Sequence, residues 1–171
     1  LDNKTIISPK QIHGNSVIRV SEDSNPSECD AIIFKANSNI IGSINIADCI
    51  PICIYDFDNE NIALVHSAAG GTGLLLTQML KRSGIRVIGT VSTDNKAVLA
   101  KEFGADYTIN YRDSDFSQEV LRLTEGVGVQ AVYDAVGVDT FDQGVASLAT
   151  RGHMVMYGNA SGPVVDIPAS V

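Results

Sequence analysis

The stretch Val65-His66-Ser67-Ala68-Ala69-Gly70-Gly71-Thr72-Gly73-Leu74 decides the fold of this chain. It ends an apolar run over 62–65 and opens another over 74–80, where leucines recur at helical spacing. A strand, a glycine-rich turn and a helix in this order can hold a phosphate group on backbone amides at the helix N-terminus. The stretch therefore predicts a phosphate-binding turn between a strand and a helix.

From this stretch onward, strand and helix patterns alternate. Strands are predicted over 61–66, 86–91, 107–110, 130–136 and 153–157, and helices over 72–83, 95–103, 115–124 and 140–149. Strands that alternate with helices form parallel sheets with right-handed crossovers. The sequence predicts an α/β fold, a doubly wound, Rossmann-like parallel sheet in residues 61–158.

Residues 1–60 have a different texture, without sustained helical periodicity. Isoleucines and valines between turn residues predict short strands over 16–21, 31–34, 39–47 and 50–56. We expect a β-rich segment, 1–60, joined to a Rossmann-like segment, 61–171, at the first strand of the sheet. The two segments form either two domains or one merged domain.

The composition excludes several classes of protein. A formal charge of −8 without a basic stripe disfavours nucleic acid and anionic membranes as partners. The apolar runs are too short to span a membrane, and no secretory signal precedes them. The three cysteines then indicate reduced thiols, so we expect a soluble, cytoplasmic protein. Self-association is expected if an edge of the sheet stays uncovered.

The turn at 68–73 fits the dinucleotide fingerprint, with alanine in place of the first glycine. Gly70 would let the backbone approach a pyrophosphate, and Gly73 would let the helix pack closely against the strand. A simple tight turn between strand and helix is the alternative, because a lone fingerprint is a weak signal.

The end of the next strand bears on the choice of dinucleotide. It reads Thr90-Val91-Ser92-Thr93, without the acidic residue that would bind a free ribose 2′-hydroxyl. Hydroxyl groups followed by Lys96 would suit a 2′-phosphate, which needs donors and positive charge. Asp94 is acidic and close to this position, and it favours a free 2′-hydroxyl instead. We expect NADP(H) rather than NAD(H).

One family resemblance rests on HSAAGGTGLLLTQMLK, VIGTVSTDNKAVLAKEFGADYTINYR, VYDAVG and MYGNASGP, in this order over residues 66 to about 163. These stretches resemble the cofactor domain of the zeta-crystallin-type quinone oxidoreductases, in the medium-chain dehydrogenase/reductase superfamily. The resemblance implies that the pyrophosphate lies on the turn, lined by Gly70, Gly71 and Thr72, with Ala69 and Gly73 beside them. It also implies contacts to the 2′-phosphate from Ser92, Lys96 and Tyr111. Toward the nicotinamide it places Val136, Gly137, Gly158 and Asn159.

Members of that family carry a catalytic domain before this segment and a tail after it, and this sequence contains neither. We therefore expect dinucleotide binding with little or no turnover, and we assign no catalytic residue.

A second candidate site precedes the turn. It consists of His13, Cys49 and His66, each near the end of a predicted strand. Two imidazoles and a thiolate would leave one tetrahedral position of a zinc ion open, as in catalytic zinc sites. Two isolated histidines and a buried cysteine are the alternative, because the spacing alone is a weak signal.

The second resemblance rests on QIHGNSVIRV, CDAIIF, IADCIPICIYD and NIALVHS, within residues 9–66. They resemble the laccase-domain family, also described as multicopper polyphenol oxidase or purine nucleoside phosphorylase-like proteins. The resemblance implies zinc on His13, Cys49 and His66 and activity on purine nucleosides. In that family an arginine follows the last histidine, whereas His66 runs here into Ser67 and Ala68. We therefore keep zinc binding as an expectation and do not expect nucleoside chemistry.

The two resemblances meet at His66, where both families have a strand, a glycine-containing turn and a helix. This coincidence indicates a chimera, recombined at a shared structural unit by engineering or computation. Three functions stay open: an NADP(H)-binding module, a folded chain without activity, and a zinc-binding remnant of the laccase-domain type.

Overall fold

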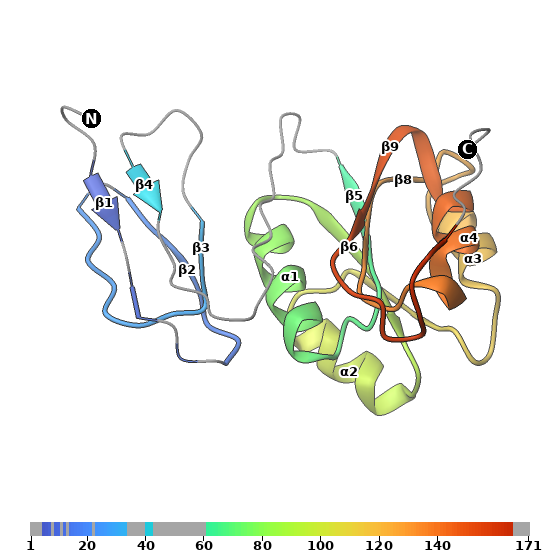
Figure 1. The fold of residues 1–171 in the computed structure, drawn as a ribbon, viewed down its shortest axis with the longest axis horizontal. Coiled ribbons are helices and arrows are strands. Elements are labelled where there is room, and N and C mark those ends of the chain that lie inside the picture. Colours follow the sequence, from blue (N-terminus) through green and yellow to red (C-terminus); the bar gives the residue numbers. More distant parts are fainter. Residues whose placement is uncertain are drawn as a thin grey trace. The chain divides into compact units, whose positions relative to one another are not determined.

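The chain forms two compact units, Leu1–Tyr55 and Asp56–Val171, in this computed structural model. The structure describes residues 5–7, 9–10, 12, 14–21, 23–33, 40–42 and 61–165. Figure 1 labels the helices and most of the strands of both units.

The first unit contains two short pairs of parallel strands. The pairs are β1 (Thr5–Ile7) with β4 (Ile40–Gly42), and β2 (Val17–Arg19) with β3 (Ala31–Ile33). A small apolar cluster forms around the buried side chains of Ile7 and Val20, against which Ile18 and Ile32 pack. The strands predicted over 16–21 and 31–34 are present in shorter form, and β1 lies outside every predicted strand. The strand predicted over 50–56 lies outside the described residues.

A parallel five-stranded sheet forms the centre of the second unit (Figure 1). Its strands are β5 (Ile62–Val65), β6 (Arg86–Val91), β7 (Tyr107–Asn110), β8 (Val129–Asp134) and β9 (Leu148–Met156). Their order in the sheet is β7-β6-β5-β8-β9, and every neighbouring pair is parallel. The first strand of the unit is thus central, which is the arrangement of a doubly wound sheet.

Four helices cover the sheet. They are α1 (Gly71–Arg82), α2 (Asp94–Glu102), α3 (Phe116–Leu123) and α4 (Val138–Ala146). Figure 1 shows α1 and α2 on one face and α3 and α4 on the other, as right-handed crossovers require. Among the described helices, none has both the length and the apolar character needed to cross a membrane.

The start of each of two helices is fixed by a side chain of the residue that precedes it. The Thr93 hydroxyl accepts the Lys96 N–H at 3.4 Å before α2. The Asp115 carboxylate accepts the N–H groups of Ser117 at 2.8 Å and Gln118 at 3.2 Å before α3. Such caps satisfy amides that have no partner inside the helix. By contrast, Gly70 precedes α1 and offers no side chain.

The larger core lies on the α3 side of the sheet. Its buried members are Ile62, Leu64, Ile88, Ile109, Phe116, Val120, Val129 and Val132. Ile62 and Leu64 of β5 are two positions apart, because alternate side chains of a strand face the same side. β5 is buried along its whole length, since it has strands on both edges and helices on both faces.

Strands β6 and β7 have the predicted bounds, whereas the later elements do not. β8 ends at Asp134 rather than at residue 136, because the Asp134 carboxylate accepts the N–H groups of Val136 at 2.6 Å and Gly137 at 3.3 Å. The helix predicted over 140–149 was wrong at both ends. It stops at Ala146, where the hydroxyl of Ser147 donates to a carbonyl of the last turn, and the chain continues directly as β9.

Gly73 is the residue of the turn that packing requires to be glycine. A Cβ atom there would overlap the carbonyl oxygen of Ser67 and lie 2.9 Å from the Cα atom of Ala68. A Cβ atom at Gly71 would meet nothing within 4 Å.

We therefore predict that Gly73→Ala lowers the free energy of unfolding by about 1–3 kcal/mol, the usual cost of overpacking. Gly71→Ala is the matched control. It should leave stability unchanged or raise it by up to about 1 kcal/mol, because alanine favours helices. Urea unfolding followed by circular dichroism of the helices measures both, and equal stability of the two variants would contradict the prediction.

Candidate functional site

The carboxyl end of β5 lies at the point where the strand order of the sheet reverses. After β5 the chain crosses to β6 on one side, whereas β8 is the neighbour of β5 on the other side. Connections that leave in opposite directions open a crevice outside the strand ends, and ligands of doubly wound sheets bind there. The turn that follows β5 is therefore in the position of a ligand site.

This turn presents backbone amides to solvent. Gly70, Gly71 and Thr72 are exposed, and α1 begins at Gly71. Within the described part of the chain, no backbone carbonyl accepts the N–H groups of Gly71, Thr72 or Gly73. These unpaired amides at the positive end of a twelve-residue helix can bind an anion. Ala69 is half-buried beside them.

The three residues predicted around a 2′-phosphate lie together at the carboxyl end of β6. The Lys96 ammonium donates to the Ser92 hydroxyl at 3.2 Å. The Tyr111 N–H donates to the carbonyl of Val91 at 3.1 Å, which places Tyr111 beside the end of β6. Tyr111 and Lys96 are exposed, so hydroxyl and ammonium groups are available to a ligand. Asp94, the contrary residue, is exposed in the first turn of α2.

The residues predicted toward the nicotinamide also lie together. They belong to two segments that follow β8 and β9, and the N–H of Val138 donates to the carbonyl of Gly162 between these segments at 3.1 Å. Gly137 has φ 101°, and a Cβ atom there would lie 3.1 Å from the Cα atom of Asn159. A Cβ atom on Gly158 would lie 2.7 Å from the carbonyl oxygen of Ala135. Glycine is needed at both positions for this close approach.

A buried polar group lies under the turn, on the α3 side. His66 is 1% exposed, and its Nδ1 atom lies 3.0 Å from the Thr90 hydroxyl oxygen. Its ring packs edge-to-face on Phe116, with ring centroids 4.8 Å apart. Burial lowers the pKa of His66 to about 4, although the charge of Asp134 acts in the opposite direction. His66 is therefore neutral at physiological pH.

Asp134 is fully buried at the end of β8 and has a structural role. Besides two backbone N–H groups, its carboxylate accepts the Thr140 hydroxyl at 2.8 Å. Burial raises the pKa of Tyr157 to about 12, and the negative charge of Asp134 contributes in the same direction. The carboxylate thus orders the connection between β8 and α4.

The predicted zinc site is only partly described. His13 and Cys49 lie outside the described residues, and the Nδ1 atom of His66 is occupied by Thr90. Among the residues that the structure describes, no group of three histidine, cysteine or acidic side chains could hold a metal ion. Zinc binding by His13, Cys49 and His66 stays a prediction.

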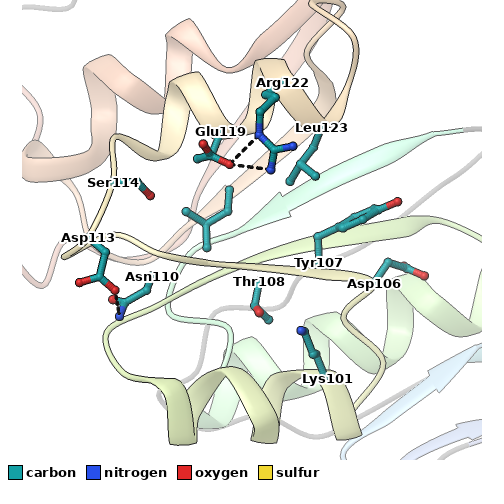
Figure 2. A pocket seen from close by; sticks show the side chains of 11 residues that line it. Lys101, Asp106, Tyr107, Thr108, Asn110, Asp113, Ser114, Glu119, Arg122 and Leu123 are labelled. Carbon is teal, nitrogen blue, oxygen red and sulfur yellow. Dashed lines mark hydrogen bonds and ion pairs between the residues drawn. The ribbon is translucent and has the colours of Figure 1, made fainter.

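A surface pocket of about 290 Å³ lies elsewhere, along the outer edge of β7 (Figure 2). Polar side chains of β7, α2 and α3 line it, and several of them pair with each other. The Arg122 guanidinium contacts Glu119 at 2.8 Å, and the Asn110 amide donates to Asp113 at 2.6 Å (Figure 2). None of the residues predicted to hold the dinucleotide lines this pocket.

Thr90 belongs to the neighbouring strand β6, contacts the turn, and is not singled out by the sequence pattern. It stands in a buried strand, where its hydroxyl contacts His66 and accepts the Ser67 N–H at 3.3 Å. Its carbonyl accepts the Ala68 N–H at 3.0 Å. The one feature of the sequence that could have indicated this role is that Thr90 is a polar residue within the apolar run of β6.

A doubly wound parallel sheet with an exposed glycine turn at its switch point defines a Rossmann-like fold. Residues 71–171 match the family of zinc-binding dehydrogenases, and residues 1–100 match the family of multi-copper polyphenol oxidoreductase laccases. The chain belongs to the zinc-binding dehydrogenase family through the first match and to the laccase family through the second.

Individual relatives match more than half of the chain. The quinone oxidoreductase of Pseudomonas aeruginosa is 43% identical over 113 residues, which are 66% of this chain and 35% of that protein. A 2-haloacrylate reductase of a Burkholderia species is 44% identical over 99 residues, 58% of this chain and 30% of that protein. The chain thus spans about a third of the length of these curated relatives.

Two similar solved structures contain a dinucleotide. The Escherichia coli quinone oxidoreductase complexed with NADPH is 41% identical with a TM-score of 0.62, over 65% of this chain and 34% of that one. A mycobacterial protein complexed with NADPH is 48% identical with a TM-score of 0.64, over 68% of this chain and 36% of that one.

The buried imidazole predicts a pH dependence of stability. The folded chain holds the pKa of His66 near 4, whereas an unfolded histidine has a pKa near 6.5. Between these values the unfolded chain binds more protons, so the free energy of unfolding falls as pH decreases from 6.5 to 4 and loses nothing further below 4. The contribution of His66 is about 3 kcal/mol.

Urea unfolding at several pH values measures this dependence. The variant His66→Gln should lose that part of the slope, because glutamine does not titrate. His153→Gln, which replaces an exposed histidine of β9, is the control and should keep it. Parallel profiles for the wild-type chain and His66→Gln would show that the imidazole is not buried in its neutral form.

Proposed function

We propose that the second unit binds NADP(H), with the pyrophosphate beside Gly70 on the amides of Gly71, Thr72 and Gly73, and the 2′-phosphate between Ser92, Lys96 and Tyr111. The observation that carries the proposal is the exposed turn with unpaired amides at the switch point, beside the Ser92–Lys96 pair. The NADPH found in the two similar solved structures supports the choice of dinucleotide.

The phosphates would be held by charge and by backbone geometry. A pyrophosphate on the start of α1 would gain hydrogen bonds from amides that otherwise have only water as partner, and the helix dipole favours its negative charge. The Lys96 ammonium would add a charge-assisted hydrogen bond to the 2′-phosphate. NAD(H), which lacks this phosphate, would not use that interaction.

We further propose that Val136, Gly137, Gly158 and Asn159 face the nicotinamide. The segments after β8 and β9 approach each other closely at Gly137 and Gly158, where a Cβ atom would contact the backbone. A bound nicotinamide supplies hydride chemistry, and reduction of a quinone is proposed only by analogy with the named relatives. Dinucleotide binding is the part of such an activity that the described residues support by themselves.

We also propose that the chain is a chimera, in which residues before His66 and after it come from different families. Two observations support this origin. One family match begins at residue 1 and the other reaches residue 171, and the chain divides into two compact units after Tyr55. An uninterrupted natural gene that encodes the same chain would contradict the proposal.

Binding predicts a preference for NADPH that depends on Lys96. At an NADPH concentration of 100 times its Kd, the second unit should gain about 2.7 kcal/mol of stability, visible as a rise in Tm. Lys96→Gln should weaken NADPH binding roughly tenfold or more, because a hydrogen bond to a charged group is lost, and should leave NADH unaffected. Fluorescence titration measures both ligands.

Lys101→Gln is the matched control, since Lys101 is exposed on the same helix but lies outside the proposed site. It should bind NADPH like the wild-type chain. An equal loss of NADPH affinity in Lys96→Gln and Lys101→Gln would indicate a general effect of net charge. If neither dinucleotide changes Tm or fluorescence, the chain is a folded protein without this function.

A further inference from the structure

The turn that carries the proposed pyrophosphate site contains one unfavourable backbone conformation. Ser67 has φ 52°, in the left-handed region that residues with a side chain rarely adopt. The surrounding structure must therefore hold this residue in place. Ser67 is exposed, so packing of its side chain does not supply the restraint.

Thr90 supplies hydrogen bonds on both sides of that residue. From the neighbouring strand β6, its hydroxyl oxygen accepts the Ser67 N–H at 3.3 Å. Its carbonyl oxygen accepts the next amide, that of Ala68, at 3.0 Å. Two successive amides of the turn, those of Ser67 and Ala68, thus donate to the same residue of the neighbouring strand.

His66 orients the hydroxyl of Thr90. The Nδ1 atom lies 3.0 Å from that hydroxyl oxygen, and the imidazole is buried and neutral. A threonine hydroxyl can donate one hydrogen bond and accept two, so it can bond to Nδ1 while its oxygen accepts the Ser67 N–H.

The position of Ser67 in turn decides where α1 begins. Its carbonyl accepts the Gly70 N–H at 2.8 Å, and the same oxygen lies so close to Gly73 that no Cβ atom fits there. A shift of Ser67 would therefore move the exposed amides of Gly71 and Thr72.

We propose that Thr90 is a positioning residue for pyrophosphate binding: its hydroxyl, oriented by His66, fixes Ser67 and through it the amide-bearing start of α1. This inference rests on the proposed binding of NADP(H) and adds a residue that does not touch the ligand. It predicts that loss of the hydroxyl weakens the binding of ligands that carry a pyrophosphate. The binding of ligands that carry only the 2′-phosphate should not change.

The test compares Thr90→Val, which keeps the shape of the side chain, with Thr90→Ser, which keeps the hydroxyl. Thr108→Val, on the neighbouring strand β7, is the matched control for the loss of a threonine hydroxyl. The ligands are NADPH, which contains a pyrophosphate, and adenosine 2′-monophosphate, which does not. Isothermal titration calorimetry gives the Kd of each.

Thr90→Val should raise the Kd for NADPH about five- to tenfold, as expected for lost hydrogen bonds of this kind, and change that for adenosine 2′-monophosphate less than about twofold. Thr90→Ser and Thr108→Val should bind both ligands like the wild-type chain. Unchanged NADPH binding in Thr90→Val, an equal loss for both ligands, or a Thr90→Ser variant as weak as Thr90→Val would overturn the proposal. If Thr90→Val does not fold, Thr90→Ala replaces it with the same expected pattern.

Amide hydrogen exchange in the free chain separates this proposal from the proposed function. Exchange of the Ser67 amide should be at least about fivefold faster in Thr90→Val than in the wild-type chain, and unchanged in Thr108→Val. If the wild-type chain binds no NADPH, the proposed function fails, while this exchange rate still decides whether Thr90 holds the turn. An unchanged rate shows that it does not.

Discussion

The carbonyl oxygen of Ser67 is the point on which the second unit depends. Gly70 donates to it, and the backbone of Gly73 passes so close that a side chain is excluded. This contact joins the end of the central strand β5 to the start of α1. Because β5 has neighbours on both edges, the same contact orients the first helix relative to the whole sheet.

Much of this unit could be predicted from local patterns. The bounds of β6 and β7 follow from apolar runs that end at clear turn residues, and Gly73 was identified by its spacing in the fingerprint. The groups Ser92–Lys96–Tyr111 and Gly137–Gly158 are brought together by the parallel order of the strands, as the α/β rhythm predicts. Whether these residues hold a dinucleotide is a separate question, which binding measurements decide.

Other features depend on contacts that a local pattern does not contain. The end of β8 is set by the carboxylate of Asp134, and the end of α4 by the hydroxyl of Ser147. Likewise, Thr90 matters because it lies beside Ser67 in the next strand, 23 residues along the chain. Propensity cannot reveal such pairs. The short strands β1 and β4 pair across more than thirty residues, which explains why β1 escaped prediction.

The sheet order also limits what can be attached to this unit. Both hydrogen-bonding edges of β5 are occupied, by β6 and β8, so a foreign segment fused ahead of β5 cannot insert a strand beside it. Of the five described strands of this sheet, only β7 and β9 have an open outer edge. The segment that precedes β5 can therefore be replaced without changing the hydrogen bonds between the strands of the sheet. The start of β5 is for this reason a position that tolerates fusion to a different segment.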